Sequence, residues 1–310
     1  MKEEKVKKRK PIWLRILIWV LSSILSLTAL VGVGCGILYF KFQINVFAVI
    51  NQVKVLNQEV NINNLAPNSY SLDDLANAKD ITDANLAGLI SYSVEDGYSI
   101  TPENVNNAMT GELKFSDKQI GAIINNFIEN QEELNVEIGK TINLKEHGFK
   151  IVEISFSNIT ETTADFRLVM KFNLTQLKEK HMNSFPINWV KNFTPETIYI
   201  SATSTITKNN GAFNYSTEGK SLTINNLSEK DTASFLNTAN LLFKLGSTKD
   251  FANTICGSFI NLLIGNEETS GLTYSLKSAG ATDFAFESDA SGNYYVIKMW
   301  WLISTNNKTI

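Results

Sequence analysis

The sequence contains few of the residues that build covalent or metal-linked frameworks. Its only two cysteines are Cys35, inside a long apolar run, and Cys256, inside a predicted helix. A cysteine within a bilayer cannot reach one in a domain outside it, so neither a disulfide framework nor a cysteine-based metal site is expected. The chain must instead fold around an apolar core, for which its 44% hydrophobic residues are sufficient.

Histidine is equally scarce. The two histidines, His147 and His181, have no His, Cys or Asp at metal-ligand spacing, and no cysteine lies near either one. Zinc sites and nucleophilic triads are therefore not expected. The sequence also lacks a Gly-x-Ser-x-Gly elbow, a Walker loop and a dinucleotide-binding glycine fingerprint. No metal or cofactor is predicted.

Carboxylates provide the one route to catalysis that the composition leaves open. Three acidic pairs are adjacent in the sequence: Asp73 and Asp74, Glu132 and Glu133, and Glu267 and Glu268. Adjacent residues point to different faces of a helix or strand, whereas a hydrolytic pair needs two carboxyl groups about 5–9 Å apart in a cleft. We interpret all three pairs as solvated surface.

Positive charge is concentrated at the N-terminus and scarce elsewhere. Eight basic and two acidic residues precede position 42, which leaves 20 basic and 29 acidic residues beyond it, a net charge of −9. Nucleic-acid binding needs clustered cations that neutralise phosphates, so no nucleic-acid partner is expected. The same charge would repel anionic lipid head groups.

One long uncharged run follows the basic start. Residues 16–40, ILIWVLSSILSLTALVGVGCGILYF, include 25 residues without a charge. At about 1.5 Å per helical residue, this run exceeds the roughly 30 Å hydrocarbon core of a bilayer. We predict a transmembrane anchor over residues 12–41, with the basic tail in the cytoplasm and the C-terminal domain outside. The lipid bilayer is thus the first predicted partner.

Two other fates of this run fit less well. A cleaved signal peptide has an apolar stretch of about 7–15 residues, and this one is longer. Lipoprotein processing at Cys35 would need a bulky aliphatic residue where Gly32 stands, and apolar residues continue to Phe40. A membrane-spanning helix that contains Cys35 is the favoured interpretation.

The segment after the anchor has a helical pattern. Its apolar residues alternate in spacings of four and three: Phe42, Val46, Val49, Val53, Leu56 and Val60. We predict a helical stalk over residues 42–60 that packs on its own domain, since the pattern is too short for a coiled coil. The Asn- and Asp-rich residues 61–111 are predicted to be a linker with small helices around 72–78, 83–93 and 102–109.

From residue 112 the pattern becomes that of an α+β domain. Leu113 and Phe115 end a short strand, and Ser116 begins a helix with an apolar stripe that includes Ile120 and Ile124. Strands are predicted at 149–157, 163–174, 197–207, 212–224, 272–277, 282–287 and 294–303. Capping-box patterns at Ser228 and Ser247 begin two further helices. Neighbouring strands interrupted by blocks of helices predict a mainly antiparallel sheet packed on helices.

This order of elements, together with FSDKQIGAIINNF at residues 115–127, resembles the YpmS-like family of single-pass membrane proteins of low-GC Gram-positive bacteria. The resemblance covers about residues 112–264 and the N-terminal anchor. It implies an extracytoplasmic domain and no particular activity. The strands beyond residue 270 lie outside it.

The final predicted strand is apolar on both faces, which is typical of a strand covered on both sides. It includes Tyr295, Ile297, Lys298, Met299, Trp300 and Trp301. One interpretation is a central strand of the core. The other is that one face lines an apolar groove for a lipid or peptide, with Lys298 at its rim.

The sequence therefore predicts an α+β protein with an N-terminal transmembrane helix and an extracytoplasmic domain. The predicted parts are a basic cytoplasmic tail (1–11), the anchor (12–41), the stalk (42–60), the linker (61–111), the α+β domain (112–304) and a polar tail (305–310). The expected function is non-enzymatic binding of an envelope partner protein or an apolar, lipid-like ligand. The alternative is a carboxylate-dependent hydrolase that acts on envelope polymers.

Overall fold

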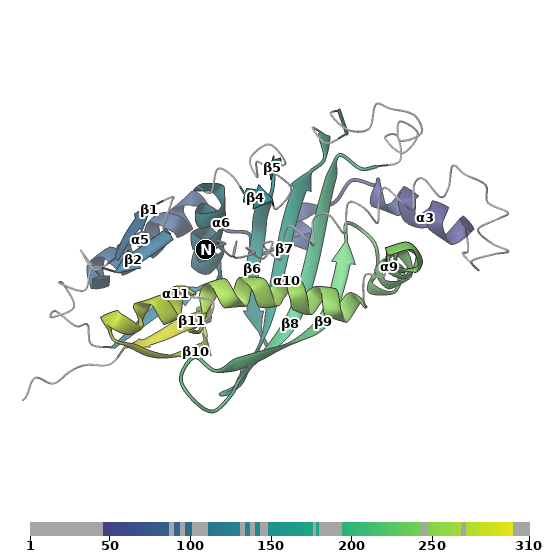
Figure 1. Ribbon diagram of the computed structural model, residues 1–310. Helices are drawn as coiled ribbons and strands as arrows, with labels where there is room; N and C mark the ends of the chain where they lie inside the picture. The colour runs from purple at the N-terminus through teal and green to yellow at the C-terminus, as the bar shows by residue number, and fades with distance from the viewer. Residues whose placement is uncertain are drawn as a thin grey trace, which may run out of the picture.

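A computed structural model describes residues 46–86, 90–93, 97–100, 111–130, 134–136, 140–142, 148–175, 178–179, 194–243, 247–267 and 271–299. The predicted anchor at 12–41 and the polar tail at 305–310 lie outside these residues. Within the described ranges, no helix is long and apolar enough to cross a membrane. The fold is α+β, with antiparallel sheets packed against helices (Figure 1).

The largest element is a four-stranded antiparallel sheet. Its strands are β6 (Lys150–Ser157), β7 (Thr163–Asn173), β8 (Thr197–Lys208) and β9 (Tyr215–Ile224), and they pair in sequence order. All four were predicted from the sequence, and the structure confirms them, although the strand predicted at 212–224 begins at Tyr215. Because strand side chains alternate between faces, one face of β7 buries Phe166, Leu168 and Met170, while the other carries Arg167 and Lys171.

Helix α10 (Thr248–Leu263) lies across the apolar face of this sheet, as Figure 1 shows. Ser247 and Asp250 form the predicted capping box at its start. The helix approaches β9 so closely that a Cβ atom added to Gly219 would lie 1.9 Å from the carbonyl oxygen of Lys249. The buried Ser204 hydroxyl of β8 also donates to the Ala252 carbonyl at 3.2 Å.

A smaller sheet and two helices form the other end of the molecule. The sheet has the order β10 (Ala281–Asp289), β11 (Gly292–Met299) and β3 (Gly111–Ser116), all antiparallel. Helix α6 (Asp117–Asn130) follows β3 directly and packs on β6 and on α5 (Leu72–Leu86). The predicted start of α6 is confirmed, because Ser116 and Gln119 bond reciprocally through side chain and backbone.

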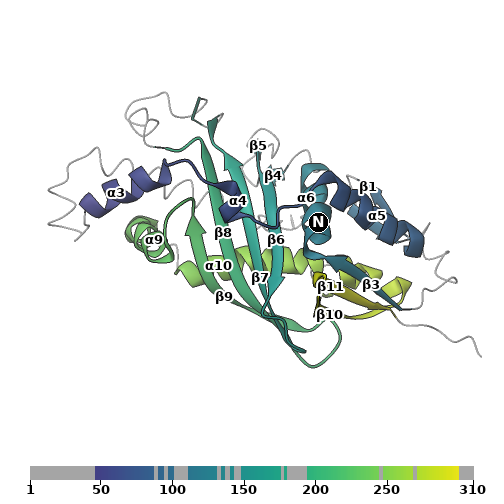
Figure 2. The ribbon, with the colours of Figure 1, turned by 180° about the vertical axis from the view of Figure 1, so that it is seen from behind.

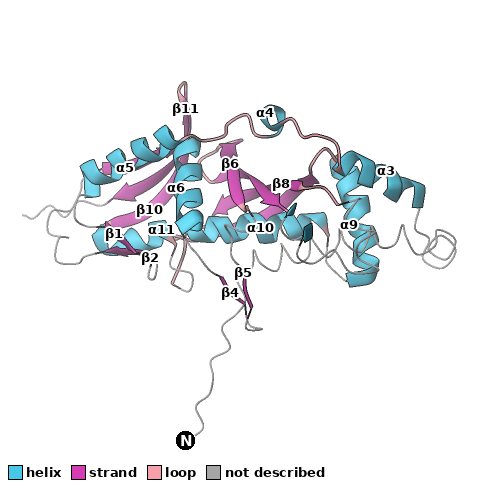
Figure 3. Ribbon diagram, turned by 90° about the horizontal axis from the view of Figure 1, so that it is seen from above, coloured by secondary structure: helices cyan, strands magenta, loops and turns pink. Residues whose placement is uncertain are grey.

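Helix α3 (Val46–Leu56) lies at the opposite end, beside α9 (Glu229–Phe243) (Figures 1 and 3). Its stripe of Val49, Val53 and Leu56 is buried in the core of the domain, as the spacing predicts. Residues 57–71, here called the strap, then run over the second face of the large sheet and include α4 (Ile62–Leu65). Figure 2 shows the strap leading from α3 towards α5, and Figure 3 shows α4 and α10 on opposite sides of the sheet.

Two predictions of local structure were wrong, and one hairpin was not predicted. Residues 272–277 form α11 (Leu272–Ser275) and a 3-10 turn (Leu276–Ala279) instead of a strand. The Thr273 hydroxyl donates to the Leu263 carbonyl at 2.9 Å, so contact with the end of α10 decides the conformation of this short apolar run.

The predicted helix at 83–93 is also wrong in its second half. Helix α5 ends at Leu86, and β1 (Ile90–Ser93) pairs with β2 (Gly97–Ile100). The hairpin of β4 (Leu134–Val136) and β5 (Lys140–Ile142) was not predicted. The predicted helix at 102–109 lies outside the described residues.

Candidate functional site

The described members of the predicted groove divide between the core and the surface. Strand β11 is the central strand of its sheet, and Tyr295, Ile297 and Met299 are buried in the core. The Tyr295 and Thr273 hydroxyls are 2.6 Å apart, and burial raises the pKa of Tyr295 far above its usual value. Trp300 and Trp301, the other two apolar members, lie outside the described residues.

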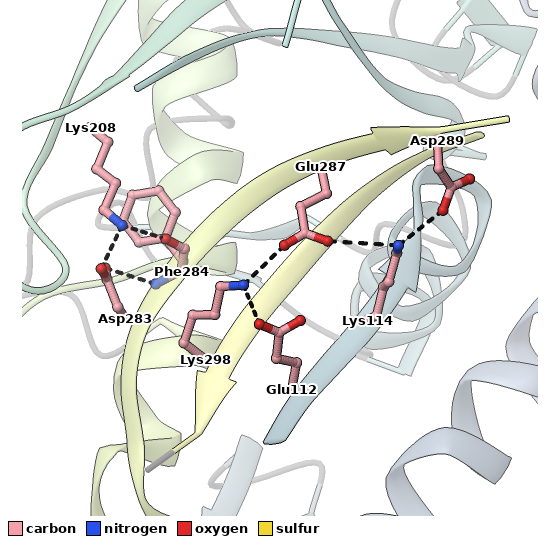
Figure 4. Close-up of polar contacts among 8 residues, drawn as sticks. All are labelled: Glu112, Lys114, Lys208, Asp283, Phe284, Glu287, Asp289 and Lys298. Carbon is pink, nitrogen blue, oxygen red and sulfur yellow. Dashed lines mark hydrogen bonds and ion pairs between the residues drawn. The ribbon is translucent and has the colours of Figure 1, made fainter. Parts of the chain in front are cut away.

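Lys298 lies on the other face of β11, in the ladder of charges drawn in Figure 4. It forms ion pairs with Glu112 and Glu287, and Lys114 continues the ladder to Glu287 and Asp289. Burial alone would lower the pKa of Lys298, but its hydrogen bonds to the two glutamates outweigh burial and raise it. The Lys298 ammonium therefore stabilises the small sheet and does not border an apolar surface of Tyr295 and Ile297.

A buried carboxylate holds the strap on the large sheet. Glu153 of β6 is 0% exposed, and it accepts hydrogen bonds from the Asn68 amide at 2.8 Å, from the Ser155 hydroxyl at 3.1 Å and from the Arg167 guanidinium. A second guanidinium nitrogen of Arg167 donates to the Leu65 carbonyl of the strap. Glu153 thus has a structural role, because its hydrogen bonds join the strap to strands β6 and β7.

Asp117, in the first turn of α6, is a described carboxylate whose pKa is raised, as an acid–base catalyst would require. Burial raises its pKa, the Lys118 amide lowers it, and the negative charge of Glu153 raises it further.

Of the adjacent acidic pairs, Asp73 and Asp74 are described in α5, where Asp74 accepts from the Ser71 amide at 2.7 Å. Asp74 therefore caps a helix, as a surface interpretation expects.

Neither other acidic pair forms a described site. Glu267 is exposed, and Glu132, Glu133 and Glu268 lie outside the described residues, as do both histidines. No group of three or more His, Cys, Asp or Glu side chains in the described part of the chain could hold a metal ion.

The one described cysteine is not a nucleophile. Cys256 is fully buried in α10, and burial raises the pKa of its thiol to about 12. A thiol with that pKa remains protonated at neutral pH, so it reacts poorly. Its role is to fill core space beside the large sheet.

A cavity of about 760 Å³ opens where β7 ends and β8 begins. It is lined by Leu56 at the end of α3 and residues 57–60 at the start of the strap, by Thr175, Lys178 and Glu179 after β7, and by residues 194–197 and Tyr199. A volume of this size is typical of ligand sites in proteins. Because three segments far apart in the sequence build the cavity, no local motif could have predicted it.

Two asparagines fix the strap wall of the cavity. The side-chain nitrogen of Asn225 donates to the Leu56 carbonyl at 2.7 Å, and its side-chain oxygen accepts from the Tyr199 backbone amide at 2.7 Å. Asn226 donates to the carbonyls of Gln58 and Glu59 at 3.2 and 3.1 Å. Asn225 has a φ of +48°, a conformation that asparagine tolerates better than most residues. The wall is therefore pre-formed by the turn after β9.

The cavity is polar and carries more negative than positive charge. Its ionisable side chains are Glu59, Glu179, Glu196 and Lys178. Lys178 donates to the Thr194 carbonyl at 2.7 Å. Among the described residues, Glu59 and Glu196 have no ion-pair partner, and both are exposed.

No family model matches the chain, and comparison with curated proteins and with solved structures finds no significant match.

Proposed function

We propose that this protein is a non-enzymatic binding domain, tethered to the outer face of the cell membrane by residues 12–41, and that it binds a partner protein of the envelope. The observation that carries the proposal is the polar cavity beside β7 and β8, with a volume of about 760 Å³. Its walls are held by backbone and asparagine contacts, which suits a site that binds without rearrangement.

The composition of the cavity favours a polar partner over an apolar ligand. Hydroxyls, amides and carboxylates line it, whereas the described apolar residues of β11 are packed in the core. The lipid-like ligand expected from the sequence now depends on Trp300 and Trp301 alone. A protein segment, which offers amide and charged groups, fits the described cavity better.

Site-specific photo-crosslinking in intact cells tests this proposal. A benzoylphenylalanine placed at Gln58, an exposed residue of the cavity, is compared with one placed at Glu161. Glu161 is also exposed and precedes the start of β7, whereas the cavity lies at the end of that strand. We expect the full-length chain to crosslink a defined envelope protein from Gln58 and not from Glu161. The same products from both positions, or none from Gln58, would refute partner binding at the cavity.

A carboxylate-dependent hydrolase is the second candidate, and Asp117 is its candidate general acid, because burial in the first turn of α6 raises the pKa of this carboxyl group. Its test is the release of soluble fragments from purified cell-wall polymer by the full-length chain. An enzyme would release fragments, and Asp117→Asn would abolish the release. No release by the unmodified chain would eliminate this candidate.

A further inference from the structure

The chemistry of the cavity specifies what the partner must present. We infer that the cavity binds a cationic side chain, the ammonium of a lysine or the guanidinium of an arginine, carried on a polypeptide segment of the partner. This inference rests on the proposed function and identifies the chemical group that the same site recognises.

The first support is the unpaired negative charge in a concave place. The acids of the small sheet, Glu112, Glu287 and Asp289, are paired with lysines. Other exposed acids such as Glu229 and Glu267 have no ion-pair partner among the described residues, but they lie outside the cavity. Glu59 and Glu196 line the cavity from two different segments, and neither has an ion-pair partner among the described residues. Carboxylates in a cleft focus the electric field and attract cations more strongly than carboxylates on a convex surface.

The second support is Tyr199, a half-buried aromatic residue in the same lining. An aromatic face attracts ammonium and guanidinium groups, and the Lys171 ammonium already lies 5.9 Å from the centroid of this ring. Carboxylates together with an aromatic ring suit an organic cation.

The third support is the charge of the whole outer region. A net charge of −9 beyond residue 41 steers basic segments towards the domain and repels acidic ones. Lys178 is the one described cation in the lining, and its bond to the Thr194 carbonyl directs it towards the cavity wall. The cavity therefore has a counter-charge whose removal should strengthen binding.

The test uses pentalysine amide as the probe and the full-length chain in phosphatidylcholine nanodiscs, whose lipid has no net charge to attract the probe. We expect the double substitution Glu59→Gln and Glu196→Gln to weaken binding about 2- to 30-fold, the range for two partly solvated ion pairs. Lys178→Met should tighten it. Calorimetry at two salt concentrations measures both effects, and higher salt should reduce the difference.

A matched control separates the cavity from the diffuse charge of the domain. The double substitution Glu229→Gln and Glu267→Gln removes the same charge from two exposed acids outside the cavity. We expect it to weaken binding much less than the cavity pair does. Equal losses from both pairs, or no loss from the cavity pair in a variant that melts like the unmodified protein, would overturn the inference.

Crosslinking from Gln58 distinguishes the two levels of the proposal. One outcome is that the Glu59→Gln, Glu196→Gln variant still crosslinks the partner and binds pentalysine as tightly as the unmodified chain. The partner then binds at the cavity, but recognition of a cationic side chain by these glutamates is wrong. If no partner crosslinks to the unmodified chain, the proposed function itself is wrong.

Discussion

Arg167 is the one arginine beyond residue 15, although the chain has 28 basic residues. Its position explains why a lysine would not serve. The guanidinium reaches Glu153 with one nitrogen and the Leu65 carbonyl with another, whereas the three N–H donors of an ammonium all leave a single nitrogen. The residue joins a buried carboxylate to the strap, so its geometry matters as much as its charge.

Arg167→Lys should therefore destabilise the protein by about 1–3 kcal/mol, because one charge-assisted hydrogen bond is lost beside a fully buried acid. Hydrogen exchange should also become faster at the Asn68 amide, which donates a hydrogen bond to Glu153. Urea unfolding and exchange measure the two effects. Lys171→Arg, on the same face of β7, serves as the control and should change stability by less than about 0.5 kcal/mol.

Asp165 predicts a dependence of stability on pH. Burial alone would raise its pKa, but hydrogen bonds from Lys220, Asn158 and Thr205 outweigh burial and lower it. A carboxyl whose pKa is lower in the folded state stabilises the fold above its unfolded pKa of about 3.9, and this contribution is lost as the pH falls through the folded value.

Asp165→Asn should consequently cost about 1–3 kcal/mol at pH 7, and the difference from the unmodified protein should shrink below about pH 4. Urea unfolding at pH 7, 5 and 3 checks this. The exposed Asp80→Asn is the matched control. A difference that stays constant from pH 7 to pH 3 would show that the ionised carboxylate is not what matters.

At the scale of the elements, the crossing of α10 over β9 depends on a glycine, Gly219, which has no side chain to keep the helix away. Gly219→Ala would place a Cβ 1.9 Å from the Lys249 carbonyl, so the helix would have to move, at a cost of about 1–3 kcal/mol or more. Gly257→Ala, within α10, meets only the Thr217 hydroxyl at 3.4 Å and should stabilise the helix by about 1 kcal/mol. Thermal melting of both variants should give shifts of opposite sign.

The elements that the sequence predicted correctly are those with long, repeated signals. Strand β7 alternates over eleven residues, and α6 and α10 begin at side-chain caps that are local in sequence. Short runs failed, because the three apolar residues at 272–277 (Leu272, Tyr274 and Leu276) fit a helix turn as well as a strand. The cavity could not be predicted at all, since its walls meet only after β7, β8 and the strap are in place.

At the scale of the whole molecule, the proposed topology makes a direct prediction. Protease added to intact cells stripped of wall should remove the domain from residue 46 onwards and leave a small membrane fragment with the basic tail, because the proposed topology places the tail in the cytoplasm. Immunoblotting with tags at each end measures the products. A C-terminal tag that remains protected until the membrane is dissolved would contradict the proposed orientation.

The position of α3 sets how far the cavity can stand from the bilayer. In the proposed topology the anchor ends at residue 41. The four residues 42–45 could then span at most about 14 Å, and the eleven residues of α3 add about 16 Å before Leu56 at the cavity wall. The cavity is then confined to a layer about 30 Å deep. A partner that is itself held in the membrane would meet it by diffusion in two dimensions, whereas a protein free in the surrounding medium would have to enter that layer first.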